Sequence, residues 1–163
     1  MLSSKWRWFV LSAVIVVADQ IAKWAVLGYF ADRAPRQEIT GFFNLMLVCN
    51  KGAAFSMFAD APGWQTPLLI VFALVAAGLV SWLIVRNPGK RLLCLGLALI
   101  LGGALGNLID RLRFGHVVDF LDFHALGWHW PAFNVADSGI TVGAVLLILD
   151  GFAHHEKRAG APS

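Results

Sequence analysis

Four long apolar segments constrain this chain more than any other feature of its sequence. They cover residues 6–27, 67–85, 92–109 and 138–153. A helix needs about 17–25 mostly apolar residues to cross the roughly 30 Å hydrocarbon core of a bilayer, and only the last segment falls slightly short. The chain is 58% hydrophobic and 14% charged, whereas an average soluble domain is about 25% charged. The sequence therefore predicts one integral membrane domain, residues 1–163, with four transmembrane helices.

The first apolar segment follows a basic start, as a signal peptide does, but its length indicates a retained helix. A signal peptide has an apolar region of about 7–15 residues followed promptly by a small-residue cleavage site. Residues 6–27 form a longer run, and no convincing cleavage site follows it.

The basic residues of the short connections predict the orientation. Connections rich in lysine and arginine remain in the cytoplasm. The larger group of basic residues falls on the side of both termini, and the smaller group falls on the other side. Both termini are therefore expected in the cytoplasm, and residues 28–66 and 110–137 outside it. The larger group is Lys5, Arg7, Arg86, Lys90, Arg91, Lys157 and Arg158, and the smaller is Arg33, Arg36, Lys51 and Arg113.

The two outer segments carry strand-like and aromatic patterns. The stretch "EITGFFNLMLVCN" is rich in β-branched and aromatic residues, which favours strands ending at a glycine turn. Trp64, Trp128, Trp130 and Phe133 belong to the class of rings that prefers the headgroup level of a bilayer. Both segments are therefore expected to follow the outer membrane surface. The sequence contains no basic cluster of the kind that indicates nucleic-acid binding.

The two cysteines are not expected to form a disulfide. The predicted topology places Cys94 near the inner end of a membrane helix and Cys49 outside. Each is instead predicted to be a buried apolar residue.

Ionisable residues inside the apolar segments are costly, so they indicate a functional site by default. Asp19 and Lys23 are spaced i, i+4 and can pair on one helix face. Asn107, Asp110 and Arg111 share one side of the third apolar segment. Both groups can also be structural, as an ion pair and a polar knot between helices. Small residues that permit close helix approach precede the second group, namely Gly102, Gly103 and Gly106.

Asp119 and Asp137 are the candidate catalytic pair. Both are predicted at the same outer depth in apolar surroundings, and Ser138 adjoins one of them. Two carboxylates that share a low-dielectric site hold one proton between them, which lets one activate water while the other protonates a carbonyl. Taken alone, Asp137 is more typical of a cap at a helix N-terminus than of a catalyst. Its shared depth with Asp119 in apolar surroundings is what favours catalysis. Asp122, three residues after Asp119, is interpreted as a solvated or capping residue.

Other functions remain open from these residues alone. Zinc binding by His116, His124 and His129 with a nearby aspartate is disfavoured by irregular spacing. A small ion-coupled transporter would also place polar residues between helices, but these cluster toward one membrane face. A non-enzymatic assembly factor would use the polar groups only to hold helices together.

Five ordered sequence motifs resemble those of the bacterial lipoprotein signal peptidases, also called signal peptidase II. The resemblance covers nearly the whole chain from Asp19 to about Asp150. It implies that the catalytic dyad is Asp119 and Asp137. The motifs are "DQIAK" (19–23), "NKGAAF" (50–55), "GGALGNLIDR" (102–111), "GHVVDF" (115–120) and "FNVADS" (133–138). Further family positions, which look like site scaffolding and substrate contacts, fall on Asp19, Lys23, Asn50, Gly52, Asn107, Asp110, Arg111, Asn134 and Ala136.

The resemblance also implies an activity and a location. The family removes the signal peptide of a prolipoprotein just before a diacylglyceryl-modified cysteine, as an aspartic peptidase without metal or cofactor. It implies an all-α, four-helix protein of the bacterial inner membrane that acts as a monomer, with its site on the extracytoplasmic side. Its expected partners are lipid-modified prolipoproteins and membrane lipid. A small β-rich cradle and an interfacial amphipathic element are expected outside. One departure is Ala22, where the family usually has a hydroxyl residue.

Overall fold

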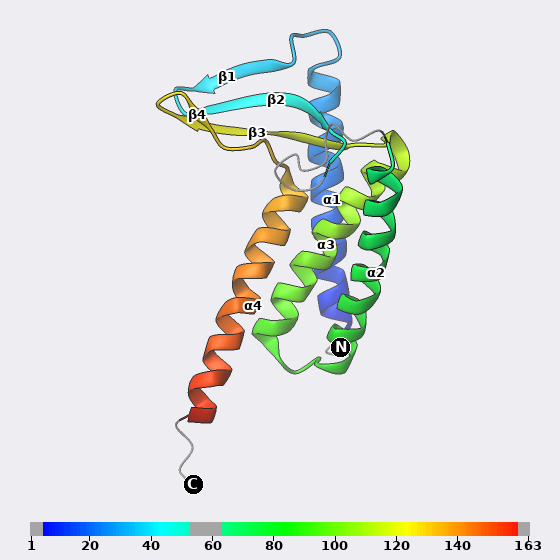
Figure 1. The fold of residues 1–163 in the computed structure, drawn as a ribbon, viewed down its shortest axis with the longest axis vertical. Helices are drawn as coiled ribbons and strands as arrows, with labels where there is room; N and C mark the ends of the chain where they lie inside the picture. The colour runs from blue at the N-terminus through cyan, green and yellow to red at the C-terminus, as the bar shows by residue number, and fades with distance from the viewer. Residues whose placement is uncertain (1–4, 53–62, 160–163) are drawn as a thin grey trace.

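Four long helices form a bundle, and a small antiparallel sheet covers one end of it (Figure 1). The structure is a computed structural model that describes residues 5–52 and 63–159. All four helices are long and apolar enough to span a membrane, which confirms the predicted membrane architecture. At 1.5 Å per residue, even the shortest helix is about 33 Å long, enough for the hydrocarbon core. The helices are α1 (Trp6–Tyr29), α2 (Gln65–Arg86), α3 (Arg91–Phe114) and α4 (Val135–Ala159).

Two helices extend further outward than the sequence pattern predicts. Residues 110–114, expected in an outer loop, form the last turn of α3, which ends where Gly115 adopts a left-handed conformation with φ 74°. Helix α4 begins at Val135 instead of residue 138, because Asn134 caps its first turn. Both candidate segments therefore bring polar side chains to the bundle on rigid helical backbone.

Helix α3 packs against each of the other three helices, and its glycines permit the closest approaches. A Cβ atom on Gly102 would lie 2.8 Å from the Ser12 carbonyl oxygen of α1, and one on Gly103 would lie 2.2 Å from the Ala136 carbonyl oxygen of α4. Both distances are shorter than van der Waals contact. The prediction that these glycines allow close helix packing is confirmed.

The sheet combines both outer segments in the order β1-β2-β3-β4. The first segment supplies the hairpin of β1 and β2, as its pattern predicts, and the second supplies β3, which pairs with β2. The second segment was expected only to follow the membrane surface, but it also contributes a strand to the sheet. No further helix, and so no counterpart of the amphipathic element, occurs among the described residues of these segments. The strands are β1 (Arg36–Thr40), β2 (Phe43–Asn50), β3 (Val117–Ala125) and β4 (Trp128–His129).

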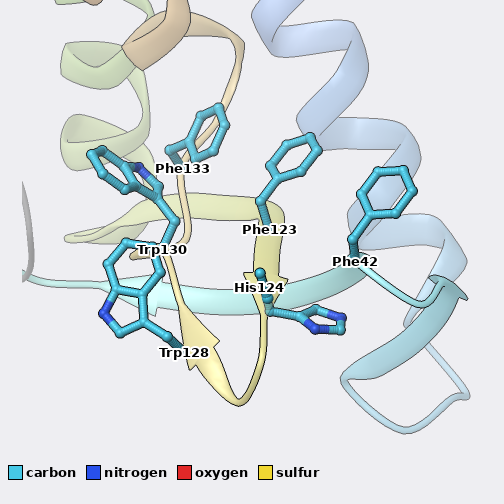
Figure 2. Close-up of a pocket in the computed structure, with 7 residues that line it drawn as sticks. Phe42, Phe123, His124, Trp128, Trp130 and Phe133 are labelled. Atoms are coloured by element: carbon cyan, nitrogen blue, oxygen red, sulfur yellow. The ribbon is translucent and has the colours of Figure 1, made fainter.

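Aromatic side chains surround a cavity of about 410 Å³ at one end of the sheet (Figure 2). Figure 2 shows the rings of Phe42, Phe123 and Phe133 projecting toward the side of the sheet on which the helices lie. Trp128 and Trp130 complete the cavity from the end of the sheet. These rings remain partly exposed, so they form an apolar surface next to the helix bundle.

The first turn of α1 and the last turn of α4 lie far from the sheet (Figure 1). Helix α1 begins, and helix α4 ends, at the end of the bundle opposite the sheet (Figure 1). The turn between α2 and α3 lies at that same end, where the Trp8 indole donates to the Pro88 carbonyl at 3.3 Å.

Candidate active site

Asn134 and Asp137 fix the start of α4 through reciprocal hydrogen bonds. The Asp137 amide donates to Asn134 Oδ1 at 2.9 Å, and the Asn134 amide donates to Asp137 Oδ2 at 3.2 Å. This is a capping-box arrangement, which satisfies amides that have no partner within a helix. Asp137 does cap the start of the helix, but as the third residue of α4, because Asn134 is the N-cap. These hydrogen bonds also hold the Asp137 carboxylate at the outer end of α4.

Asp119 faces the same asparagine from strand β3. Asn134 Nδ2 donates to Asp119 Oδ1 at 2.7 Å, and Asn50 Nδ2 donates to Asp119 Oδ2 at 2.9 Å. Asp119 is only 2% exposed. Asp119 and Asp137 thus lie on either side of Asn134, each with both carboxylate oxygens engaged by donors.

Asp119 is held in an environment that favours its protonated form. Burial and then the nearby charge of Asp137 raise the pKa of Asp119 to about 7, although the hydrogen bonds from Asn50 and Asn134 oppose that rise. A carboxyl group with this pKa carries a proton for about half of the time at neutral pH. Asp119 can therefore exchange a proton with a substrate near physiological pH.

Lys23 is the centre of a buried ionic network below the two aspartates. Its ammonium group lies 2.8 Å from Asp19 Oδ2 and 2.8 Å from Asp110 Oδ2, and it donates to Asn107 Oδ1 at 3.0 Å. The predicted pairing of Asp19 with Lys23 is confirmed. A buried ammonium group needs such partners because its charge is removed from water.

Asn107 connects this network to the candidate dyad. Its Oδ1 accepts from Lys23 and from Asn134 Nδ2, the latter at 3.2 Å, while its Nδ2 donates to Asp137 Oδ1 at 2.7 Å. The orientation of the Asn107 side-chain amide is fixed, because its oxygen must face the donors and its nitrogen must face the Asp137 carboxylate. The Lys23 network consequently orients a side chain that touches Asp137.

Asp19, Asn50 and Arg111, which were also predicted as site residues, bind backbone groups around the site. Asp19 Oδ1 accepts the Ala136 amide at 2.9 Å, which links α1 to the first turn of α4. Arg111 donates to the Gly52 carbonyl at 3.0 Å, and the Gly52 amide donates to Asn50 Oδ1 at 2.9 Å. The "NKG" backbone is thereby tied to α3 and to the side chain that contacts Asp119. Residues 53–55 of the same motif lie outside the described residues.

Two site residues were missed by sequence reasoning or assigned differently. Gln20 Nε2 donates to Asp110 Oδ1 at 2.9 Å and to the Gly106 carbonyl at 3.2 Å, and the signal for it was a polar amide in an apolar span. Ser138 was noted beside Asp137, but its hydroxyl donates to the Asn134 carbonyl at 3.0 Å within the helix.

The interpretation of Asp122 as a solvated or capping residue is wrong. Asp122 lies within β3 and is 3% exposed. The neighbouring residues Phe120 and Leu121 both pack into the apolar cluster beside α1, and both amides donate to the Phe133 carbonyl. A regular strand would place such consecutive side chains on opposite faces. This β-bulge returns Asp122 to the face of Asp119, and both line one cavity.

Among the described residues, no cysteine or histidine is a hydrogen-bond partner of Asp119 or Asp137. Cys49 and Cys94 are both free, which confirms that they do not pair, but Cys49 is exposed instead of buried. His129 pairs with Asp122, at 2.9 Å between Nδ1 and Oδ1. Among the described residues, no three His, Cys, Asp or Glu side chains are grouped as metal ligands would be.

Comparison with known proteins assigns the chain to a family. Residues 11–153 match the family model described as signal peptidase (SPase) II. The chain belongs to the signal peptidase II family. The lipoprotein signal peptidase of Ralstonia nicotianae is 57% identical over 143 residues, which cover 88% of this chain and 82% of that relative. The lipoprotein signal peptidase of Janthinobacterium sp. is 51% identical over 148 residues, which cover 91% and 89%.

Solved structures share the fold of this signal peptidase II family member. A bacterial membrane enzyme solved by the in meso method at 2.3 Å resolution gives a TM-score of 0.81 at 24% identity, covering 96% of this chain and 94% of that chain. A second bacterial membrane enzyme, solved by the same method at 1.9 Å resolution, gives 0.72 at 26% identity, covering 88% and 90%. The arrangement of four helices and an outer sheet is therefore one found in bacterial membrane enzymes.

Proposed function

We propose that this protein is an aspartic endopeptidase that removes the signal peptide from diacylglyceryl-modified prolipoproteins, with Asp119 and Asp137 as its catalytic dyad. Membership of the signal peptidase II family supports the activity. The observation that supports the dyad is its geometry: two carboxylates from different elements flank one asparagine and sit above a buried ionic network. Cleavage falls just before the lipidated cysteine.

The chemistry needs one carboxyl group in each protonation state. The ionised aspartate removes a proton from water while the protonated one donates to the carbonyl oxygen of the scissile bond. The C–N bond of the resulting tetrahedral intermediate then breaks as the leaving amine takes up the proton that the first aspartate removed from water, and the second aspartate recovers its proton as the carbonyl forms again. The raised pKa of Asp119 suits it to hold the proton near neutral pH. Asn50, Asn107 and Asn134 keep both carboxylates oriented without supplying a charge of their own.

The location of the site suits a membrane-anchored substrate. The chain is a multi-pass membrane protein of a bacterial enzyme family, and the dyad lies at the sheet end of the bundle. We place it in the bacterial inner membrane as a monomeric single domain, with termini in the cytoplasm and sheet outside. The aromatic cavity lined by Phe42, Phe123 and Trp128 then contacts outer-leaflet lipid, since such rings favour the headgroup level (Figure 2).

The dyad is tested with purified protein in detergent and a diacylglyceryl-modified prolipoprotein. Asp119→Asn and Asp137→Asn should each lower kcat by about 100-fold or more, because each removes a group that transfers a proton. Asp32→Asn is the matched control, since Asp32 is an exposed carboxylate on the first outer segment. Either dyad variant cleaving at the wild-type rate would refute the assignment.

Two further arms separate this function from its rivals. Unlipidated precursor should be a poor substrate, and a chelator should leave the rate unchanged. Loss of activity on chelation, with recovery on adding zinc, would instead support chemistry through the histidines of the second outer segment.

A further inference from the structure

A second cavity, lined by both polar and apolar residues, adjoins Asp119 on the sheet. It has a volume of about 320 Å³. Its polar lining residues are Arg36, Asp119, Asp122 and His129. Trp130 lines both this cavity and the aromatic one of Figure 2, so it forms the wall between them. This second cavity therefore reaches the candidate catalytic carboxylate, and Trp130 divides it from the apolar surface.

Asp122 and His129 form a fixed pair in this cavity. Asp122 Oδ2 accepts from Asn44 Nδ2 at 2.6 Å, and Asp122 Oδ1 lies 2.9 Å from His129 Nδ1. Burial opposes the charge of Asp122, but these two hydrogen bonds, together with the charges of His129 and Arg36, lower the pKa of Asp122 below its usual value. Asp122 is thus an anion whose oxygens are both engaged, and its function is to orient the imidazole.

His129 and Arg36 retain polar groups that can meet a ligand. The His129 side chain is 43% exposed, and with Nδ1 turned to a carboxylate the opposite ring nitrogen, Nε2, is the one left for a ligand. Arg36 is exposed on β1 and supplies a cation at the same cavity. A hydroxyl or amide side chain suits both, because it accepts from a guanidinium and donates to a neutral imidazole.

The position of the cavity identifies the part of the substrate that would reach it. Asp119 and Asp122 are three residues apart along β3, a span of at most about 10 Å because the bulge at Phe120 and Leu121 shortens it. An extended peptide advances about 3.3–3.6 Å per residue, so the matching side chain lies about three residues from the scissile bond. The apolar signal peptide belongs beside the helices and the aromatic surface, whereas Asp122 projects from the face of β3 opposite Phe123, the face that it shares with Asp119. The segment that crosses this face is the mature part of the precursor.

We propose that His129 and Arg36, with Asp122 as the positioning residue for His129, form a specificity subsite for an uncharged polar side chain at the third residue of the mature lipoprotein. This subsite rests on the proposed function, since it assumes cleavage at Asp119. It gives the enzyme a preference that depends on the protein part of its substrate and not only on the lipid.

The test uses lipopeptides that carry a signal sequence, a dioleoylglyceryl cysteine and an alanine-rich mature segment with one variable residue. Serine at the third mature position should raise kcat/KM about fivefold to tenfold over alanine, the effect of one or two hydrogen bonds. The same change at the fifth position should have no effect. His129→Asn keeps an N–H that can reach Asp122 but removes Nε2, and Arg36→Gln removes the cation. Each should reduce the serine preference toward one, chiefly through KM.

Matched variants separate recognition from a merely structural role. His116→Asn and Arg33→Gln are the same substitutions in the outer segments at residues outside the cavity, and both should keep the serine preference. Equal loss of rate on serine and alanine peptides in His129→Asn and Arg36→Gln would overturn the subsite, as would an unchanged preference in both.

Binding by the Asp137→Asn protein distinguishes failure of the subsite from failure of the proposed function. Its dissociation constants for the serine and alanine lipopeptides should differ by the same fivefold to tenfold, and His129→Asn should abolish that difference. If the wild type cleaves neither peptide but this binding preference persists, the function is wrong and the subsite stands. If the binding constants are equal, the subsite is wrong.

Discussion

Asn134 determines the geometry of the candidate dyad at the residue scale. Its side chain donates to Asp119 and accepts from the amide of Asp137, while its own amide donates to Asp137. An asparagine can do this because its side chain combines a donor and an acceptor without a charge. Replacing it with an aspartate would add a further negative charge to a site that already confines two carboxyl groups.

The cost of burying Asp119 should be visible in the pH dependence of stability. The pKa of Asp119 is raised to about 7 in the folded protein and is about 3.9 in an unfolded chain. Between these values the folded state binds the proton more tightly, so this residue's contribution to stability falls as pH rises from about 4 to 7 and stays low above that. Asp119→Asn should therefore raise the melting temperature by several degrees at pH 8 and by less at pH 5.

Thermal unfolding in detergent at the two pH values provides the measurement. Asp32→Asn, at an exposed carboxylate, should show no such difference between pH 5 and pH 8. A variant Asp119→Asn that is less stable than wild type at pH 8 would contradict this account.

At the scale of elements, the approach of α3 to α4 positions Asp137. Gly103 of α3 meets the carbonyl oxygen of Ala136, the residue directly before Asp137, and Gly106 meets the Ala136 side chain and Asp19. Small residues allow this approach, which in turn lets Asn107 of α3 reach Asp137. The close packing of α3 against α4 is therefore what brings Asn107 to Asp137 in the candidate site.

Gly103→Ala should separate α3 from α4. The added Cβ would lie 2.2 Å from the Ala136 carbonyl oxygen, and backbone has to shift to relieve such a contact, at a cost of about 1–3 kcal/mol. The melting temperature and kcat should both fall. Gly78→Ala in α2 is the matched control, because a Cβ there meets nothing within 4 Å. Equal effects of the two substitutions would argue against close packing at Gly103.

At the scale of the whole molecule, the sheet and the turn between α2 and α3 lie at opposite ends of the bundle (Figure 1). The sheet carries the exposed Cys49, and the turn carries the exposed Gly89. The basic residues near the turn, Arg86, Lys90 and Arg91, are what predicts that the turn is cytoplasmic.

Cysteine labelling in intact spheroplasts tests this orientation. In a Cys94→Ala background, a membrane-impermeant maleimide should label Cys49 from outside. Gly89→Cys, in a chain lacking both native cysteines, should be labelled only after lysis. Its side chain has open space, since a Cβ at Gly89 meets nothing within 4 Å. The reverse pattern would place the candidate dyad on the cytoplasmic side.

The sequence by itself determined the four membrane helices, the strands of the first outer segment, and the pairing of Asp19 with Lys23. Each of these depends on local periodicity or on spacing within one helix, which are properties of neighbouring residues. The resemblance to signal peptidase II was also a property of ordered motifs. The sequence did not determine which part of the second outer segment forms a strand, because β3 is stabilised by pairing with β2, a strand far away in the chain.

Only the tertiary structure decided how the polar residues are connected. Asn107 and Gln20 bridge side chains from different helices, and no spacing within one segment predicts such contacts. Asp122 shows the reason most clearly: regular strand alternation would place it on the face opposite Asp119. The bulge at Phe120 and Leu121 reverses that expectation, and it forms because both side chains pack beside α1 while both amides bind one distant carbonyl.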